Sequence, residues 1–312
     1  MPTPLDVHVY ATPRCNLECP HCYYDALGRG RTPEDALPLH ELGRVITDIC
    51  QRFDADISLE GGEPFLRKGL GGMLATLPPD VLRRITLTTN GTVPVVAPAA
   101  ALRALGALRV SVDGHDDRTH RALRGVDLAK VLNTCRALAD RQVPFVTRMT
   151  LWRQNTEHLR EIYAFVAEQG MKRLSLFEYQ ASGRGSAQDS SLGVKDAQMD
   201  RFFQDLLHTP RPLTLELLTI NLAKRRVEAV ESLAGDLADA GFALNLLPRM
   251  ANCTVNYNGE IGVSPWQVTA HGASDTFAHV SSGNFLDVVE DAALAGSLYD
   301  TGEFISHVQL RA

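Results

Sequence analysis

Long uninterrupted apolar runs and an excess of basic charge are both missing from this sequence of 312 residues. Its most apolar stretch, TVPVVAPAAALRALGAL, is interrupted by proline and arginine before it reaches the length of a membrane-spanning helix. The 31 basic residues are fewer than the 37 acidic ones, and no basic run is interleaved with aromatic residues. We therefore expect a protein without a membrane span and without a nucleic-acid partner.

A secretory signal is also missing, because the first residues, MPTPLDVHVY, have neither a basic start nor an apolar centre. This predicts a cytoplasmic protein. Six cysteines in a cytoplasmic chain favour metal or redox chemistry over a disulfide framework. Hydrophobic residues make up 45% of the chain, which is enough to bury a large core.

The sequence does contain an alternation of short apolar runs with longer helical patterns. The predicted strands are 6–11, 55–61, 83–91, 107–114, 143–151 and 171–180. The predicted helices between them are 38–53, 69–77, 97–105, 127–141 and 155–170. This alternation predicts an α/β fold with a parallel sheet, and six such units fit a partial (β/α)6 barrel of the TIM type. In such folds the functional residues gather at the carboxyl ends of the strands.

The pattern changes after the sixth predicted strand. Further helices are predicted at 195–208, 225–240 and 286–299. The Asn-Gly pair in CTVNYNGEIGVSP predicts a hairpin over 253–265. We therefore divide the chain into a barrel core, 1–185, and a small α+β C-terminal extension, 186–312.

Three of the six cysteines, Cys15, Cys19 and Cys22, lie within eight residues, among proline, asparagine and glutamate. Such a stretch is typical of a loop, which disfavours buried structural cysteines. A zinc site with His21 as the fourth ligand is a second interpretation, but His21 lies between two cysteines that would bind the same ion. A third is an iron–sulfur cluster held by three thiolates, which leaves one iron without a protein ligand.

The spacing C-x3-C-x2-C, followed by the aromatic residue Tyr23, resembles the radical S-adenosylmethionine (SAM) superfamily. The resemblance implies that Cys15, Cys19 and Cys22 hold a [4Fe–4S] cluster whose open iron binds the amino and carboxylate groups of SAM. One electron then cleaves SAM to methionine and a 5′-deoxyadenosyl radical. An electron donor such as flavodoxin or ferredoxin is therefore an implied partner.

Motifs at the ends of later predicted strands support the resemblance, which covers about residues 5–185. They are LEGGEP, TTNG, SVDG and LFEYQASGRG. In LEGGEP, Gly61 and Gly62 allow the backbone to approach a ligand closely, and Glu63 can accept a hydrogen bond from the ammonium group of SAM.

The resemblance implies further contacts with SAM. Ser111 and Asp113 resemble positions that line the ribose and methionine moieties, and Arg148 is a candidate for the carboxylate of SAM. Asn90 ends the third predicted strand. Glu178 ends the sixth, where the family often contacts adenine.

The motifs most resemble the branch with a cysteine-rich C-terminal extension, called SPASM or, when shortened, twitch, which includes peptide maturases. Here the extension is degenerate, because ANCTVNYNGEIGVSPW contains Cys253 but no second cysteine. Cys50 and Cys135 fall in predicted helices and suit an apolar core. We therefore predict one cluster only. Cys253 is either a hydrogen-atom donor to a substrate radical or a buried thiol.

We expect a radical SAM enzyme that modifies a ribosomally made precursor peptide, by cross-linking or another change at carbon. A small molecule of natural-product biosynthesis (a sugar, nucleoside or amino acid) is the alternative substrate. A non-enzymatic iron–sulfur scaffold is a third interpretation, which the strand-end motifs disfavour. Other residues expected near the barrel mouth are Tyr179, Gln180, Arg184, Tyr257, Glu260 and Trp266.

Overall fold

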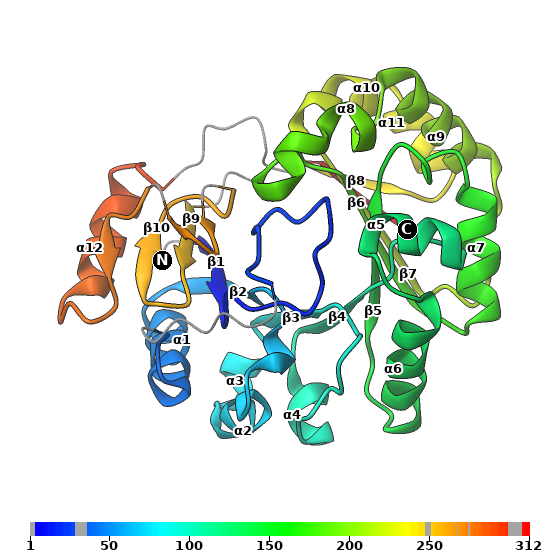
Figure 1. The fold of residues 1–312 in the computed structure, drawn as a ribbon. Helices are drawn as coiled ribbons and strands as arrows, with labels where there is room; N and C mark the ends of the chain where they lie inside the picture. Colours follow the sequence, from blue (N-terminus) through cyan, green and yellow to red (C-terminus); the bar gives the residue numbers. More distant parts are fainter. Residues whose placement is uncertain (1–3, 29–35, 247–250, 267, 274, 299–307) are drawn as a thin grey trace.

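The computed structural model describes residues 4–28, 36–246, 251–266, 268–273, 275–298 and 308–312. Its main feature is a curved sheet with the strand order β13-β10-β9-β1-β2-β3-β4-β5-β6-β7-β14-β8. The neighbouring strands from β9 through β1 to β7 are all parallel. The sheet forms an arc that lies inside a layer of helices (Figure 1).

The strands have the following bounds. They are β1 Pro4–Tyr10, β2 Asp54–Glu60, β3 Ile85–Thr89, β4 Ala107–Ser111, β5 Val146–Leu151, β6 Arg173–Glu178, β7 Leu217–Leu222, β8 Ala243–Leu246, β9 Ala251–Val255, β10 Glu260–Gly262, β13 Ala278–His279 and β14 Val308–Arg311. A separate two-stranded sheet contains β11 Val268–Thr269 and β12 Gly272–Ala273.

The helices connect and cover these strands. They are α1 Leu39–Arg52, α2 Leu70–Thr76, α3 Pro79–Leu82, α4 Ala99–Ala104, α5 Asp117–Arg124, α6 Leu128–Asp140, α7 Leu159–Glu168, α8 Asp189–Leu192, α9 Asp196–His208, α10 Val227–Ser232, α11 Ala234–Asp239 and α12 Phe285–Leu294. Short 3-10 turns occupy Pro64–Leu66, Gly183–Gln188 and Lys224–Arg226.

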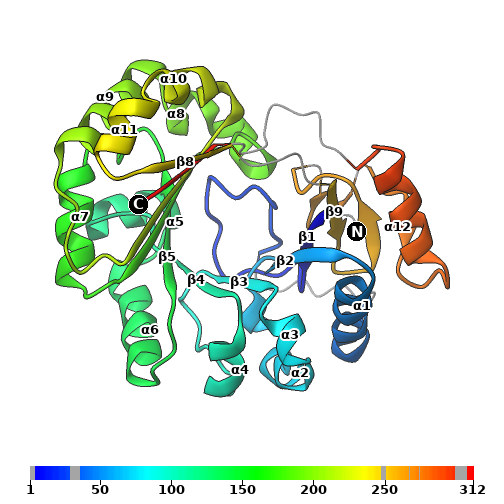
Figure 2. The ribbon, with the colours of Figure 1, turned by 180° about the vertical axis from the view of Figure 1, so that it is seen from behind.

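The predicted partial barrel is confirmed, because the six predicted strands pair in parallel and in sequence order. The helices lie on the convex side of the sheet, as both views show (Figure 1, Figure 2). The strands alternate accordingly. On β1, Leu5, Val7 and Val9 are buried in the apolar core, whereas Asp6 and His8 face the hollow of the arc.

Residues after 185 extend the same sheet at both of its edges. Strand β7 pairs in parallel with β6, and β9 pairs in parallel with β1, with Val7 opposite Cys253. The Asn-Gly hairpin is present between β9 and β10, and Gly259 in its turn has a φ of +94°. The division of the chain at residue 185 remains a prediction.

Two helical regions illustrate where the sequence-based prediction differs from the structure. The predicted helix 225–240 consists of two short helices, α10 and α11, which meet at Leu233 because its backbone leaves the helical region. Helix α5 was not predicted, since its sequence, DRTHRALR, is mostly polar and buries only Thr119, His120 and Leu123.

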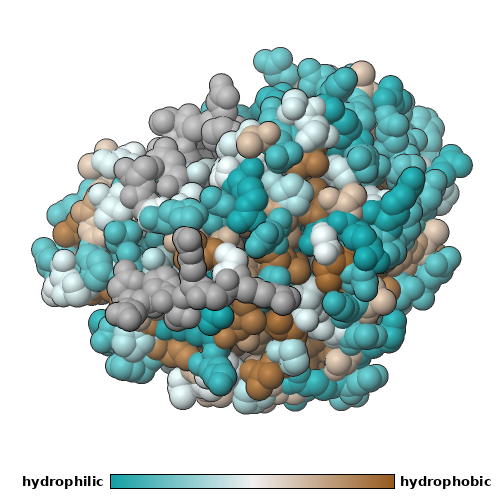
Figure 3. Space-filling view, in the orientation of Figure 1, coloured by the Kyte–Doolittle hydropathy of each residue, from teal (hydrophilic) through white to brown (hydrophobic). Residues whose placement is uncertain are grey.

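The face of the molecule seen in Figure 1 has an uneven distribution of polarity. Hydrophilic side chains cover much of the helical rim, and apolar side chains come to the surface nearer the middle (Figure 3). Among the described residues, no helix is long and apolar enough to span a membrane.

Candidate active site

The three clustered cysteines lie in a loop that follows β1 and is surrounded by the arc of the sheet (Figure 1). The loop closes on itself, because the backbone N–H of Cys15 donates to the carbonyl of Leu27 at 2.9 Å and that of Leu27 donates to Pro13 at 2.8 Å. Cys15 and Cys19 are buried and Cys22 is half-buried. The sequence thus places all three thiols at the carboxyl ends of the strands.

Gly61 and Gly62, at the end of β2, hold this loop by close backbone contact. The N–H of Gly62 donates to the carbonyl of Thr12 at 2.8 Å. A Cβ atom on Gly62 would lie 2.1 Å from the carbonyl oxygen of Arg14, and one on Gly61 would lie 2.5 Å from that of Thr12. Gly61 also has a φ of +142°. The close approach that these glycines permit is therefore an approach to the cysteine loop itself.

Glu63 joins the ends of β2 and β3. Its carboxylate is fully buried and accepts hydrogen bonds from the Thr89 hydroxyl at 2.8 Å and from the backbone N–H of Asn90 at 2.7 Å and Phe65 at 3.1 Å. Burial raises the pKa of Glu63, and these three donors oppose the rise. The predicted contact of Glu63 with SAM remains a prediction.

Asn90 connects the end of β3 to the cysteine loop. Its side-chain amide lies 3.7 Å from the sulfur of Cys15 and donates to the side-chain oxygen of Asn16 at 3.0 Å. Its own side-chain oxygen accepts from Thr92. Asn90 is therefore fixed in an orientation that presents N–H groups to a cysteine ligand.

Asp113, just after β4, is the centre of a buried charged cluster. One carboxylate oxygen is 2.5 Å from Nε of Arg124, on α5, and 3.4 Å from Nε2 of His21. The other oxygen accepts from the backbone N–H of Thr150 at 2.6 Å. Although burial raises the pKa of Asp113, Arg124 and His21 outweigh it and hold the pKa well below its usual range. Asp113 therefore remains an anion that ties β4, β5 and the cysteine loop together.

His21 does not point its ring nitrogens at the thiols. Its Nδ1 lies 3.2 Å from the carbonyl oxygen of Leu123, and its Nε2 faces Asp113. Both nitrogens are thus occupied by protein partners, which argues against His21 as a zinc ligand. Among the described residues, no group of three or more His, Cys, Asp or Glu side chains surrounds a single-ion position.

The opposite side of the cysteine loop is held by residues that follow β6. The backbone N–H of Arg184 donates to the carbonyl of Cys22 at 2.9 Å, and its guanidinium donates to the carbonyl of Ala26 at 2.8 Å. A Cβ atom on Gly183 would lie 2.0 Å from the carbonyl oxygen of Tyr23. Arg184 was expected at the barrel mouth, and the structure uses it to support the loop.

Arg148, on β5, faces the interior of the barrel. Its guanidinium lies 3.9 Å from the carboxylate of Glu60 and stacks on the ring of Phe177, 4.3 Å from the centroid. Ser111, at the end of β4, is the register partner of Arg148 and is buried. Their predicted contacts with SAM are compatible with these positions and remain predictions.

The carboxylate of Glu178, at the end of β6, is paired with other residues of the protein. Its fully buried carboxylate pairs with Arg226 at 2.9 Å and Arg225 at 2.8 Å, and it accepts from the backbone N–H of Ala223. These partners follow β7. The side chain therefore joins the end of β6 to the end of β7. Glu178 also lines the barrel cavity, and its predicted contact with SAM remains a prediction.

Cys253 lies on β9 within the apolar core, next to Val7 of β1, and is 1% exposed. Burial raises its pKa to about 12. Cys135 is buried in the same core, and Cys50 is half-buried against it. Of the two interpretations of Cys253, this position favours the buried thiol over a hydrogen-atom donor.

A cavity of about 570 Å³ occupies the interior of the barrel, and most of the residues that line it carry polar or charged side chains. Tyr179, Gln180 and Trp266, which were expected near the mouth, line it. Arg109 and Phe177 also line it, although the sequence analysis did not single them out. The alternation of polar and apolar residues along each strand was the signal that could have found them.

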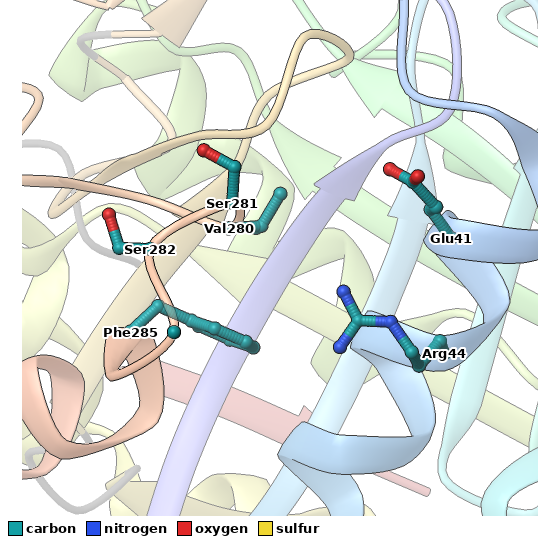
Figure 4. Close-up of a pocket in the computed structure, with 7 residues that line it drawn as sticks. Glu41, Arg44, Val280, Ser281, Ser282 and Phe285 are labelled. Carbon is teal, nitrogen blue, oxygen red and sulfur yellow. The ribbon is translucent and has the colours of Figure 1, made fainter.

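A smaller cavity of about 230 Å³ lies outside the sheet, between α1 and the segment before α12. Glu41 and Arg44 line it from α1, opposite Ser281, Ser282 and Phe285 (Figure 4). It contains no cysteine, and we assign no catalytic role to it.

The donor set of the loop fits an iron–sulfur cluster. Three thiols from one short segment supply three of the four ligands that such a cluster takes. Burial raises the pKa of the Cys19 thiol to about 12, and the nearby Arg124 opposes this rise. Because metal binding releases the thiol protons, the positive charge of Arg124 favours the bound thiolate form.

A loop of three thiols at the strand ends of a partial TIM-type barrel defines an iron–sulfur protein of the α/β class. The family model described as the Radical SAM superfamily matches residues 9–166, half of the chain, and the chain therefore belongs to the radical SAM superfamily. This superfamily uses a [4Fe–4S] cluster and SAM, and structural neighbours contain bound SAM.

Two curated relatives illustrate the similarity. A GTP 3′,8-cyclase from Synechococcus sp. (strain CC9902) is 35% identical over 122 residues, which cover 37% of this chain and 34% of the relative. A pre-heme d1 synthase from Dinoroseobacter shibae is 30% identical over 194 residues, which cover 59% and 46%. The matches thus span less than half the length of each relative.

Solved structures show a similar fold over nearly the whole chain. SuiB from Streptococcus suis, bound to the precursor peptide SuiA, aligns with a TM-score of 0.71 at 16% identity and covers 96% of this chain and 67% of its own. The SAM-bound anSMEcpe aligns with a TM-score of 0.59 at 16% identity and covers 92% and 81%. At such low identity these structures establish the fold alone.

Proposed function

We propose that the protein is a radical SAM enzyme that removes a hydrogen atom from a polar substrate bound in the barrel cavity. The bound cluster and SAM would supply a 5′-deoxyadenosyl radical at the strand ends. The main support for this proposal is that one closed loop carries three thiols at the carboxyl ends of parallel strands, inside the arc that encloses a polar cavity.

The surrounding residues have separate tasks in this proposal. Cys15, Cys19 and Cys22 would hold the cluster. Asn90 would donate to the Cys15 thiolate, since its amide already lies 3.7 Å from that sulfur. Arg148 would bind the carboxylate of SAM, because it lies on the cavity wall nearer to the strand ends than Arg109. It is two residues before Thr150, whose N–H donates to Asp113.

A ribosomally made precursor peptide is the substrate that we propose first. The support is the likeness to peptide-bound SuiB, which extends beyond the matched family region to 96% of the chain. A small molecule is the second candidate, favoured by the size of the barrel cavity and by the GTP 3′,8-cyclase relative. A flavodoxin or ferredoxin is the proposed electron donor in either case.

The test is the formation of 5′-deoxyadenosine under anaerobic conditions by reconstituted protein with SAM and dithionite. We expect about four irons per chain. Replacing Cys15, Cys19 or Cys22 by alanine should abolish both the cluster and 5′-deoxyadenosine. Cys50→Ala is the matched control, since Cys50 lies on α1 outside the loop. Wild-type protein that holds an intact cluster but never cleaves SAM would contradict the proposal.

The substrate class can be tested separately. A candidate peptide or metabolite deuterated at carbon would transfer deuterium to 5′-deoxyadenosine if it is the substrate, because the radical removes that atom directly. Mass spectrometry of the nucleoside detects the transfer. Transfer from a metabolite and from no peptide would overturn the peptide proposal and leave the proposed radical chemistry in place.

A further inference from the structure

Arg109 is a cation on the cavity wall that the proposed function does not use. It lies on β4 with Val146 as its register partner, whereas Arg148 is opposite Ser111. Arg109 is thus two residues, or about 7 Å, further from the strand ends than Arg148. It is therefore deeper in the barrel than the positions that the cysteine loop and Arg148 define.

The guanidinium of Arg109 has few protein partners. Its central carbon lies 5.4 Å from the ring centroid of Phe177, the same ring on which Arg148 stacks. Within the described parts of the chain, no ion pair and no hydrogen bond to its nitrogens is found. Arg109 is half-buried, and its guanidinium carries five N–H donors that are available to a ligand in the cavity.

Basic and acidic side chains both line this part of the cavity, with Arg109 and Arg148 accompanied by Asp6, Asp56 and Glu60. Glu60 lies beside Arg148, and its second oxygen already accepts from the hydroxyl of Tyr23. Deeper in the barrel, Asp6 faces His8 at 3.8 Å. Burial lowers the pKa of Arg109 to about 10, with Arg148 adding to the effect and Glu60 and Asp6 opposing it. Arg109 therefore stays charged at neutral pH.

An oxyanion is the ligand that would satisfy these groups. The guanidinium of Arg109 offers a planar pair of donors to a carboxylate or phosphate, the geometry in which arginine binds most strongly. The cavity, at about 570 Å³, is within the usual range for small-molecule sites. A lumen filled by branched apolar side chains, as in most TIM barrels, could not hold such a group.

The geometry points to an oxyanion subsite at Arg109, beside the ring of Phe177, that holds a carboxylate or phosphate group of the substrate in the depth of the barrel. The assignment of the anion to the substrate rests on the proposed function. A metabolite anion or an acidic side chain of a peptide could provide the same group. In both cases the anion anchors the substrate below the site of hydrogen removal.

The test measures anion binding to the reconstituted protein loaded with SAM, so that the carboxylate of SAM already has its own partners. Inorganic phosphate and succinate are titrated separately by anaerobic calorimetry. We expect at least one to bind, and we expect Arg109→Gln to weaken that binding about ten- to hundredfold. Arg109→Lys, which keeps the charge but loses the planar donor pair, should have an intermediate effect. Arg136→Gln is the control, because it removes one exposed charge from α6.

The outcomes separate the oxyanion subsite from the proposed radical SAM activity. Tighter binding of phosphate assigns a phosphorylated substrate, and tighter binding of succinate assigns a carboxylated one. If neither anion binds, or if folded Arg109→Gln with a full cluster binds as tightly as the wild type, the subsite is overturned. Wild-type 5′-deoxyadenosine formation is measured in the same preparation. Anion binding without SAM cleavage would leave the subsite standing and remove the proposed enzyme activity.

Discussion

At the scale of single residues, the site depends on a glycine that has no side chain as much as on the side chains of its neighbours. Gly62 lies so close to Arg14 that even one methyl group meets backbone atoms, which cannot rotate away. The site also depends on the protonation state of one buried side chain, His120. Its Nδ1 accepts from the backbone N–H of Asp113, and this requires the neutral ring.

We predict that Gly62→Ala displaces the cysteine loop. Its added Cβ would lie 2.1 Å from the carbonyl oxygen of Arg14, and relieving that contact should cost about 2 kcal/mol or more of stability. Iron content per chain and urea unfolding measure the two effects. Gly72→Ala is the matched control, since nothing lies within 4 Å of its Cβ position on α2. Equal iron content and stability in both variants would contradict the prediction.

We predict that His120 makes the protein sensitive to mild acid. Burial lowers its pKa to about 4, below the 6.5 of the free side chain. The unfolded chain therefore binds more protons between these values, and stability falls as pH decreases through that window. The loss should be about 2 kcal/mol between about pH 7 and about pH 5. Urea unfolding of the wild type and of His120→Asn, which cannot ionise, should show a steeper pH dependence in the wild type.

At the scale of elements, the ends of neighbouring strands are joined by buried ion pairs. Glu178 at the end of β6 is paired with Arg226 beyond β7, and both side chains are almost completely buried. Asp113 and Arg124 join β4 to α5 in the same way. Breaking such a pair leaves an uncompensated buried charge.

We predict that Glu178→Gln destabilises the protein by about 3–5 kcal/mol, because Arg226 would remain buried with much of its compensation removed. The matched control is Glu216→Gln. Glu216 pairs with Lys172 at 2.8 Å, but both are exposed, so the cost should stay below about 1 kcal/mol. Urea unfolding measures both changes. Similar losses of stability in the two variants would contradict the expected difference between a buried and an exposed ion pair.

Local signals in the sequence were sufficient for part of this site. The spacing of Cys15, Cys19 and Cys22 and the pair Gly61-Gly62 are short-range patterns, and the structure brings them into direct contact. The roles of Arg124 and Arg109 could not be predicted from short-range patterns of this kind. Each depends on which residues face it across the barrel, and that is set by pairing between distant segments.

At the scale of the whole molecule, residues from beyond position 185 complete both edges of the parallel sheet. Strand β9 pairs with the edge of β1, and β7 pairs with the edge of β6. The sequence predicted the six central strands from their alternation with helices. It did not predict β7 or the partner of β9, because parallel pairing of distant strands leaves no local pattern.

We predict that a chain ending at residue 185 does not remain a soluble monomer. Without β9 and β7, the edges of β1 and β6 would present unpaired backbone groups beside apolar residues such as Leu5 and Val9. Size-exclusion chromatography and circular dichroism of this fragment, beside the full chain, make the comparison. A folded, monomeric fragment would instead establish 1–185 as an autonomous domain.

The cysteine loop is held from two sides, by Gly62 and Glu63 after β2 and by Arg184 after β6. These contacts are made by backbone and guanidinium groups, and none of them requires iron. We therefore expect the order of maturation to be fixed, with the polypeptide folding around this loop before iron and sulfide are bound.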